Sequence, residues 1–176
     1  LCLNDSLSSE ITLQPLKRFD FDAAIIFSDI LMLPYGLGQK VEFKKNFGPK
    51  LGELNLNEIS KIDEIDFVEK IHRVYKAIKK VSSNPDLNDK NTIGFVGAPW
   101  TLLVYIINQQ SPKLKLKDDF FKDEFLINRI IIILEKFLKF NVWPPKFNDL
   151  ILMFQKELAD KIAGEYLSAN YGRISI

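Results

Sequence analysis

Residues 21–29 read Phe-Asp-Ala-Ala-Ile-Ile-Phe-Ser-Asp, and this stretch decides the fold class. Its apolar part, residues 21–27, does not alternate with polar residues, and this predicts a strand that is buried on both faces. Residues 92–96 form a second run of the same kind, which ends at Gly97-Ala98-Pro99. Buried strands separated by helical segments are typical of a parallel α/β fold.

The segments around these strands show helical spacing or turn signals. A closed (β/α)₈ barrel needs about 250 residues, so if this parallel α/β fold is a barrel, the chain of 176 residues is a partial TIM barrel with roughly half of it absent. The first predicted helix covers residues 8–19, with Ser8 or Ser9 as its cap and a kink at Pro15. A loop over 28–38, a short strand over 40–43, a helix over 65–81 and a helix from about Thr101 to Ile107 follow. The last predicted helix covers 118–140, and its apolar middle, 130–134, is expected to be deeply packed.

Composition excludes several classes of protein. The chain has 24 Lys and Arg residues against 23 Asp and Glu, which gives no electrostatic case for binding nucleic acid or an anionic membrane. No apolar run approaches the roughly 20 residues of a membrane span, and no signal peptide is visible. The first residue is Leu1, so we expect that the start of the chain is missing.

Cysteine and histidine each occur once, as Cys2 and His72. No internal disulfide or Cys/His zinc cluster can form, and this composition fits a reducing, cytosolic setting. His72 lies beside the apolar stripe of the helix over 65–81, where a boundary residue is the simplest interpretation. The sequence lacks the glycine-rich loops that bind nucleotide phosphates.

Asp29 is the first candidate site residue, because functional groups of α/β folds collect at the carboxyl ends of the strands. A carboxylate placed there among apolar residues would act as a fixed anion that accepts N–H bonds or stabilises a developing cation. The alternative is that Asp29 caps a turn or helix in the following loop.

The second candidate lies at the end of the other strand, at residues 97–101. Gly97 and Ala98 would let a large flat ligand approach the backbone, and Tyr105 would supply a phenol O–H one turn further on. The alternative is a tight turn in which Pro99 opens the helix and Tyr105 packs in the core.

Longer strings around these candidates identify a family. Residues 11–15, Ile-Thr-Leu-Gln-Pro, continue into 18–31, and 36–43, 48–49 and 95–102 follow in the same order, with Tyr105 after them. Over residues 1–139 the sequence resembles the uroporphyrinogen decarboxylase family. The resemblance implies a (β/α)₈ lyase of haem and tetrapyrrole biosynthesis that removes CO₂ from the four acetate side chains of uroporphyrinogen III and gives coproporphyrinogen III.

The resemblance also implies roles for individual residues and for partners. Asp29 accepts hydrogen bonds from the pyrrole N–H groups and stabilises a cationic intermediate, and Tyr105 contacts the substrate. The family is a cytoplasmic homodimer that uses neither metal nor organic cofactor, since the protonated pyrrole is its own electron sink. The apolar wall of the substrate site falls on Ile25, Phe27, Ile30 and Phe95, with backbone access at Gly97.

The resemblance ends near Phe140. The family's arginine-bearing segment, which handles substrate carboxylates, and its later strands have no counterpart here, so we expect this chain alone to be inactive. Residues 142–176 resemble an internal stretch of the ribosomal RNA adenine dimethyltransferase family, without its S-adenosylmethionine loop or catalytic motif. They predict an unrelated strand over 150–154 and a helix over 155–163 capped by Gly164. A fragment of that methyltransferase, or a non-catalytic fusion remnant, are the alternative functions.

Overall fold

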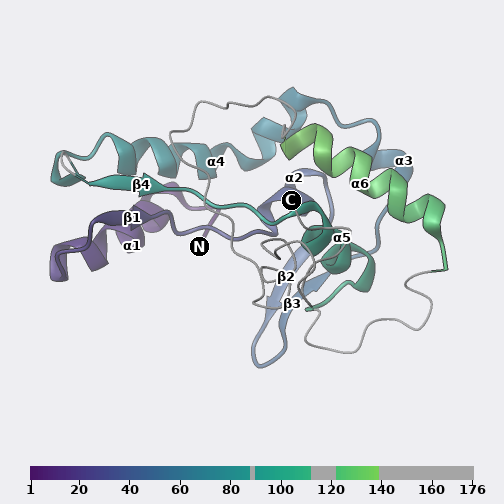
Figure 1. Ribbon diagram of the computed structural model, residues 1–176, viewed down its shortest axis with the longest axis horizontal. Coiled ribbons are helices and arrows are strands. Elements are labelled where there is room, and N and C mark those ends of the chain that lie inside the picture. The colour runs from purple at the N-terminus through teal and green to yellow at the C-terminus, as the bar shows by residue number, and fades with distance from the viewer. Residues whose placement is uncertain (88–89, 112–121, 139–176) are drawn as a thin grey trace, which may run out of the picture. The chain divides into compact units, whose positions relative to one another are not determined.

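The computed structural model describes residues 1–87, 90–111 and 122–138 (Figure 1). The predicted tail over 142–176, with its strand and helix, lies outside these residues and stays a prediction. In chain order the elements are α1 (Asp5–Arg18), β1 (Ala23–Ile25), α2 (Met32–Gly36), β2 (Val41–Lys44), β3 (Gly48–Leu51), α3 (Leu56–Ile59), α4 (Glu64–Ser82), a 3₁₀ turn (Pro85–Leu87), β4 (Asn91–Ile93), α5 (Pro99–Asn108) and α6 (Glu124–Leu138).

Strands β1 and β4 pair in parallel, with Ala24 opposite Thr92 and Ile25 opposite Ile93. This confirms the parallel α/β prediction, although both strands are shorter than predicted. The prediction that β1 is buried on both faces is wrong. Ala24 is 1% exposed, whereas the next residue, Ile25, is 62% exposed. Successive side chains of a strand point to opposite faces, and in the described residues only one face of β1 is covered.

The predicted strand over 40–43 is confirmed as β2, and it pairs with β3 in an antiparallel hairpin. The sequence analysis did not identify β3 or α3. The hairpin turn requires positive φ at Asn46 (69°) and Gly48 (77°), which asparagine and glycine tolerate better than other residues. Within the described ranges the four strands form two separate two-stranded sheets, and these do not close into a barrel.

Helix α1 begins earlier than predicted. Its cap is Asn4, whose side-chain oxygen accepts a hydrogen bond from the Leu7 amide at 3.0 Å, so Ser8 and Ser9 lie inside the helix. The helix continues through Pro15 to Arg18. It packs against α4 and β1, and Figure 1 shows these elements side by side with β4. A small cluster of buried residues joins them: Leu13, Ala24, Ile26, Val81 and Leu87.

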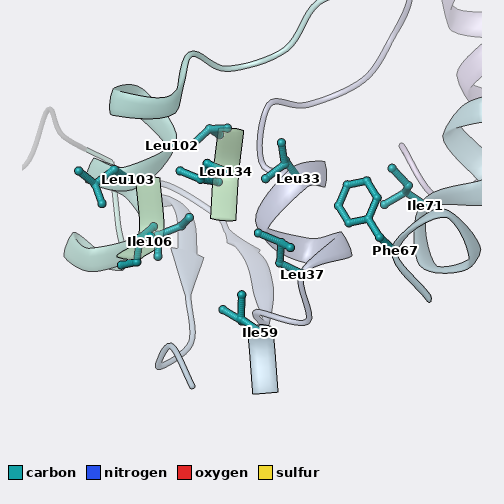
Figure 2. Close-up of a cluster of buried hydrophobic side chains, with 10 residues drawn as sticks. Leu33, Leu37, Ile59, Phe67, Ile71, Leu102, Leu103, Ile106 and Leu134 are labelled. Atoms are coloured by element: carbon teal, nitrogen blue, oxygen red, sulfur yellow. The ribbon is translucent and has the colours of Figure 1, made fainter. Parts of the chain in front are cut away.

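Helix α4 agrees with the predicted helix over 65–81 within one residue at each end. Its stripe contributes Phe67 and Ile71 to the main hydrophobic core, which lies among α2, α3, α4, α5 and α6 (Figure 2). Helix α2 lies within residues 28–38, for which the sequence predicts a loop, so this part of the prediction is wrong. A β-carbon at Gly36 would lie 2.5 Å from the Phe67 ring, so glycine lets α2 pack closely on α4.

Helix α6 begins at Glu124 and lies within the predicted helix over 118–140, whose residues 118–121 and 139–140 lie outside the described residues. Asp123 precedes it, and its carboxylate accepts a hydrogen bond from the Leu126 amide at 2.8 Å, as an N-cap residue does. The prediction that the whole of 130–134 is deeply packed is also wrong. Leu134 is fully buried but Ile132 is 65% exposed, because a helix presents only residues three or four apart to one neighbouring surface.

Candidate functional site

Asp29 lies four residues beyond the end of β1 and is half-buried. Its carboxylate Oδ1 accepts a hydrogen bond from the Leu31 amide at 2.8 Å, and its carbonyl oxygen accepts one from the Met32 amide at 3.1 Å. The turn-capping interpretation is therefore confirmed. It does not exclude a role as an anion, because among the described residues no hydrogen bond to Oδ2 competes with a ligand.

The charge of the Asp29 carboxylate affects the pKa of the Cys2 thiol. Burial raises the pKa of the half-buried Cys2 thiol, and the negative charge of Asp29 raises that pKa further. A thiolate beside a carboxylate is disfavoured by like-charge repulsion. Sequence reasoning did not connect these two residues, since 27 positions separate them in the chain and no motif joins them.

Three of the predicted apolar site residues share one hollow. Ile25, Phe27 and Phe95 line an open, mostly apolar hollow of about 460 Å³, together with Ser28, Phe21 and residues of α1 and β1. Ile25 and Phe95 are 62% and 48% exposed. This concave, mostly apolar surface runs along β1 and α1 and reaches Ser28, one residue before Asp29. Such surfaces are typical of sites for apolar rings.

Ile30 and Gly97 come together at a different place. Gly97 is buried, and a β-carbon there would lie 3.2 Å from Cβ of Ile30 and 2.8 Å from Cδ2 of Leu102. In the described residues glycine at position 97 allows the two strand ends to pack together. The predicted access of a ligand to the Gly97 backbone stays a prediction.

Tyr105 is half-buried on α5, between the core residues Val104 and Ile106. Pro99 is the first residue of that helix, as the tight-turn interpretation predicted. Neither Tyr105 nor Asp29 lines the apolar hollow. A second hollow of about 710 Å³, lined by residues of α3, α5 and α6, contains none of the predicted site residues.

Two buried hydroxyl groups of α1, those of Ser8 and Thr12, contact Phe27 just beyond β1. The sequence pattern predicts a capping role for Ser8 and no role for Thr12. Ser8 Oγ donates a hydrogen bond to the Phe27 carbonyl at 2.6 Å, and the Phe27 amide donates one to Thr12 Oγ1 at 2.8 Å. Their spacing of four residues on one helical face is the signal that could have identified them, because it places both on the side that faces β1.

The remaining sequence predictions concern His72, metal ligands and membrane spans. His72 is a boundary residue, half-buried, with Nδ1 2.7 Å from the Glu69 carbonyl oxygen. In residues 1–87, 90–111 and 122–138, no three His, Cys, Asp or Glu side chains gather as metal ligands would. The helices of the same ranges do not combine the length and the apolar character needed to cross a bilayer.

Comparison with known proteins gives one consistent result. A family model described as uroporphyrinogen decarboxylase (URO-D) matches residues 1–139. The uroporphyrinogen decarboxylase of Rickettsia rickettsii (strain Sheila Smith) is 41% identical over 139 residues, which is 79% of this chain and 38% of the relative. That of Caulobacter vibrioides (strain NA1000 / CB15N) is 42% identical over 110 residues, or 62% of this chain and 31% of the relative.

The uroporphyrinogen decarboxylase of Rickettsia bellii (strain RML369-C) is 44% identical over 106 residues, 60% of this chain and 31% of the relative. The chain thus spans about a third of the length of the curated relatives it matches. The match ends at residue 139, so the methyltransferase-like character of 142–176 stays a prediction. Over the matched residues the conclusion is clear, and the chain belongs to the uroporphyrinogen decarboxylase family.

Proposed function

We propose that residues 1–139 supply one part of the tetrapyrrole site of a uroporphyrinogen decarboxylase, in which β1 and β4 are neighbouring strands of a (β/α)₈ barrel. The observation that carries the proposal is the half-buried carboxylate of Asp29, which lies four residues beyond the parallel strand β1 and follows Ser28, a lining residue of the apolar hollow. An isolated anion beside an apolar surface suits a flat ring that becomes positively charged during the reaction.

The chemistry assigned to Asp29 needs one free carboxylate oxygen. Oδ1 is held by the Leu31 amide, which fixes the carboxylate and leaves Oδ2 to accept pyrrole N–H groups. When a ring of the substrate is protonated, the nearby negative charge stabilises the cation, and partial burial strengthens this interaction. Loss of CO₂ then returns the electron pair of the broken C–C bond to the protonated ring and leaves an exocyclic methylene. A proton added to this carbon gives the methyl group, and the ring loses the proton that it first gained, so the reaction as proposed needs neither metal nor cofactor.

The remaining predicted residues take supporting roles in this proposal. Ile25, Phe27 and Phe95 form the apolar wall, Ile30 and Gly97 join the two strand ends, and Tyr105 contacts the substrate. The cytoplasmic location and the homodimer that the resemblance implies are carried over as parts of the same proposal. We expect the 176-residue chain alone to release no CO₂, because one carboxylate cannot position a highly carboxylated ring without arginines.

The proposal is tested by a chimera in which residues 1–139 replace the matching segment of the Rickettsia rickettsii relative. We expect the chimera to convert uroporphyrinogen III to coproporphyrinogen III, as measured by chromatography of the oxidised porphyrins. Asp29→Asn should lower the rate by about 100-fold or more, since it removes the charge that stabilises the cation. Asp22→Asn is the matched control, because Asp22 is exposed before the start of the same strand.

Two outcomes would contradict the proposal. A folded chimera without activity would show that residues 1–139 cannot supply the site. An Asp29→Asn chimera as active as the Asp22→Asn chimera would remove Asp29 from the chemistry. For the 176-residue chain alone, a measurable release of CO₂ from uroporphyrinogen III would contradict the expected inactivity.

A further inference from the structure

We infer that Ser8 and Thr12 are positioning residues for Asp29. Their hydroxyl groups bind the backbone N–H and C=O of Phe27, and thereby fix the backbone that carries the carboxylate. This inference rests on the proposed function, because it gives the two hydroxyl groups a purpose in the placement of its central anion.

The hydrogen bonds define the direction of each hydroxyl proton. Thr12 Oγ1 donates to the Ser8 carbonyl at 2.8 Å, so its lone pair accepts the Phe27 amide at 2.8 Å. Ser8 Oγ donates to the Phe27 carbonyl at 2.6 Å. Both the N–H and the C=O of one residue are therefore bound by α1. Ser8 is 1% exposed and Thr12 is 4% exposed, so water has little access to replace either hydroxyl group.

The register of β1 explains why Phe27 needs such partners. The Ile26 amide donates to the Ile93 carbonyl at 3.0 Å, so the Ile26 amide points toward β4. In a strand the backbone groups of successive residues point to opposite edges, and those of Phe27 therefore point away from β4. In this direction the two hydroxyl groups of α1 bind both backbone groups of Phe27.

Only Ser28 separates this pair of bonds from Asp29. On the other side, Leu31 and Met32 bind the side chain and the carbonyl of Asp29, where α2 begins. Residues 28 and 29 are thus held at both ends, by α1 before them and by α2 after them. Loss of the Thr12 hydroxyl would leave the Phe27 amide without its partner, which is unfavourable for a half-buried N–H group. The segment of residues 28 and 29 would then be held only weakly at its Phe27 end.

Four variants separate positioning from general stability. Thr12→Val removes the hydroxyl at nearly constant shape, and Ser8→Ala removes the other one. Thr12→Ser keeps the hydroxyl and should restore the parent behaviour. Ser9→Ala is the matched control, because Ser9 is buried on the same helix and its hydroxyl donates only to the Ser6 carbonyl within α1, at 2.9 Å.

The first test is NMR on the full 176-residue chain and needs no activity. We expect Thr12→Val and Ser8→Ala to speed hydrogen exchange of the Leu31 amide, which is bound to Asp29 Oδ1, and to shift the Asp29 carboxyl carbon resonance. Ser9→Ala and Thr12→Ser should leave both signals unchanged. If Thr12→Val leaves the Leu31 amide and the Asp29 carboxyl as they are in Ser9→Ala, the inference is wrong.

The second test places the same variants in the chimera with the Rickettsia rickettsii relative. Misplacement of Asp29 should lower kcat by about 10- to 100-fold in Thr12→Val with little change in KM, and Thr12→Ser should restore the rate. An equal, small loss of kcat in Thr12→Val and Ser9→Ala would overturn the inference while Asp29→Asn still confirms the proposed function. If instead Asp29→Asn is fully active, the proposed function fails, and the NMR result still decides whether the hydroxyl groups hold the segment.

Discussion

Ile30 packs on Gly97 so closely that a β-carbon at position 97 would lie 3.2 Å from Cβ of Ile30. Ile30 follows Asp29 directly, and Gly97 lies in the segment between β4 and α5, two residues before Pro99 opens that helix. This contact therefore ties the segment that carries the candidate carboxylate to the segment that leads to Tyr105. The spacing between these two segments depends on position 97 having no side chain.

Gly97→Ala should destabilise the protein by about 1–3 kcal/mol, because the added methyl group would overlap Leu102 and press on Ile30. Chemical denaturation monitored by circular dichroism measures this change. Gly94→Ala is the matched control, since a β-carbon at Gly94 has no neighbouring atom within 4 Å among the described residues. Equal stability of the two variants would show that the contact between the strand ends is not tight.

The buried carboxylate of Asp5 makes the stability of the fold depend on pH. Hydrogen bonds from Lys80 (2.6 Å) and Arg73 (2.9 Å) hold the pKa of Asp5 well below its usual value of 3.8. A group whose pKa is lowered by folding stabilises the fold above its unfolded pKa, and this contribution is lost as the pH falls toward the folded pKa. Asp5→Asn should therefore be less stable than the parent at pH 7, and the difference should shrink below pH about 4.

Thermal unfolding at a series of pH values measures this dependence. Asp20→Asn provides the comparison, because Asp20 is also paired with a lysine, Lys90, at 2.6 Å, but its side chain is 99% exposed. Solvent screens such an exposed pair, so its removal should change the unfolding temperature little. A stability difference between Asp5→Asn and the parent that does not change from pH 7 to pH 3 would contradict the assignment.

The charge of Asp29 can be measured through Cys2. Because the Asp29 carboxylate raises the pKa of the Cys2 thiol, Asp29→Asn should lower that pKa, and the thiol should then react faster with a disulfide reagent near pH 8. Burial also raises the pKa and is unchanged, so the pKa should not fall to that of an exposed cysteine. The pH dependence of the reaction rate gives the pKa. An identical pKa in Asp29→Asn and Asp22→Asn would show that no charge interaction exists.

Two residues of α6 should differ strongly in their effect on stability. Leu134 is fully buried in the main core, whereas Ile132 is 65% exposed to solvent. Leu134→Ala should destabilise the protein by about 2–5 kcal/mol through the cavity that it leaves. Ile132→Ala should change stability by about 0.5 kcal/mol or less. Similar effects in denaturant titrations would contradict the packing of α6.

Local pattern was sufficient for several elements. The stripe of apolar residues from Phe67 to Val81 predicts α4 within one residue at each end, because a helix at a surface repeats every 3.6 residues. The apolar run ending at Phe27 predicts a parallel strand, and Asp29 follows it as expected. Local pattern failed at α2, since Pro34 and Gly36 are turn formers that here lie inside a short helix packed on α4.

The sequence by itself determined the family and the parallel α/β class, because these follow from motif strings and from residue order. It also named Asp29 as a candidate anion, which stays a prediction. Only the tertiary structure decided which strand face is uncovered, that Gly97 makes room for Ile30, and that Ser8 and Thr12 bind Phe27. The physical reason is that these features join residues distant in the chain, and the burial of one side chain depends on which other segment packs against it.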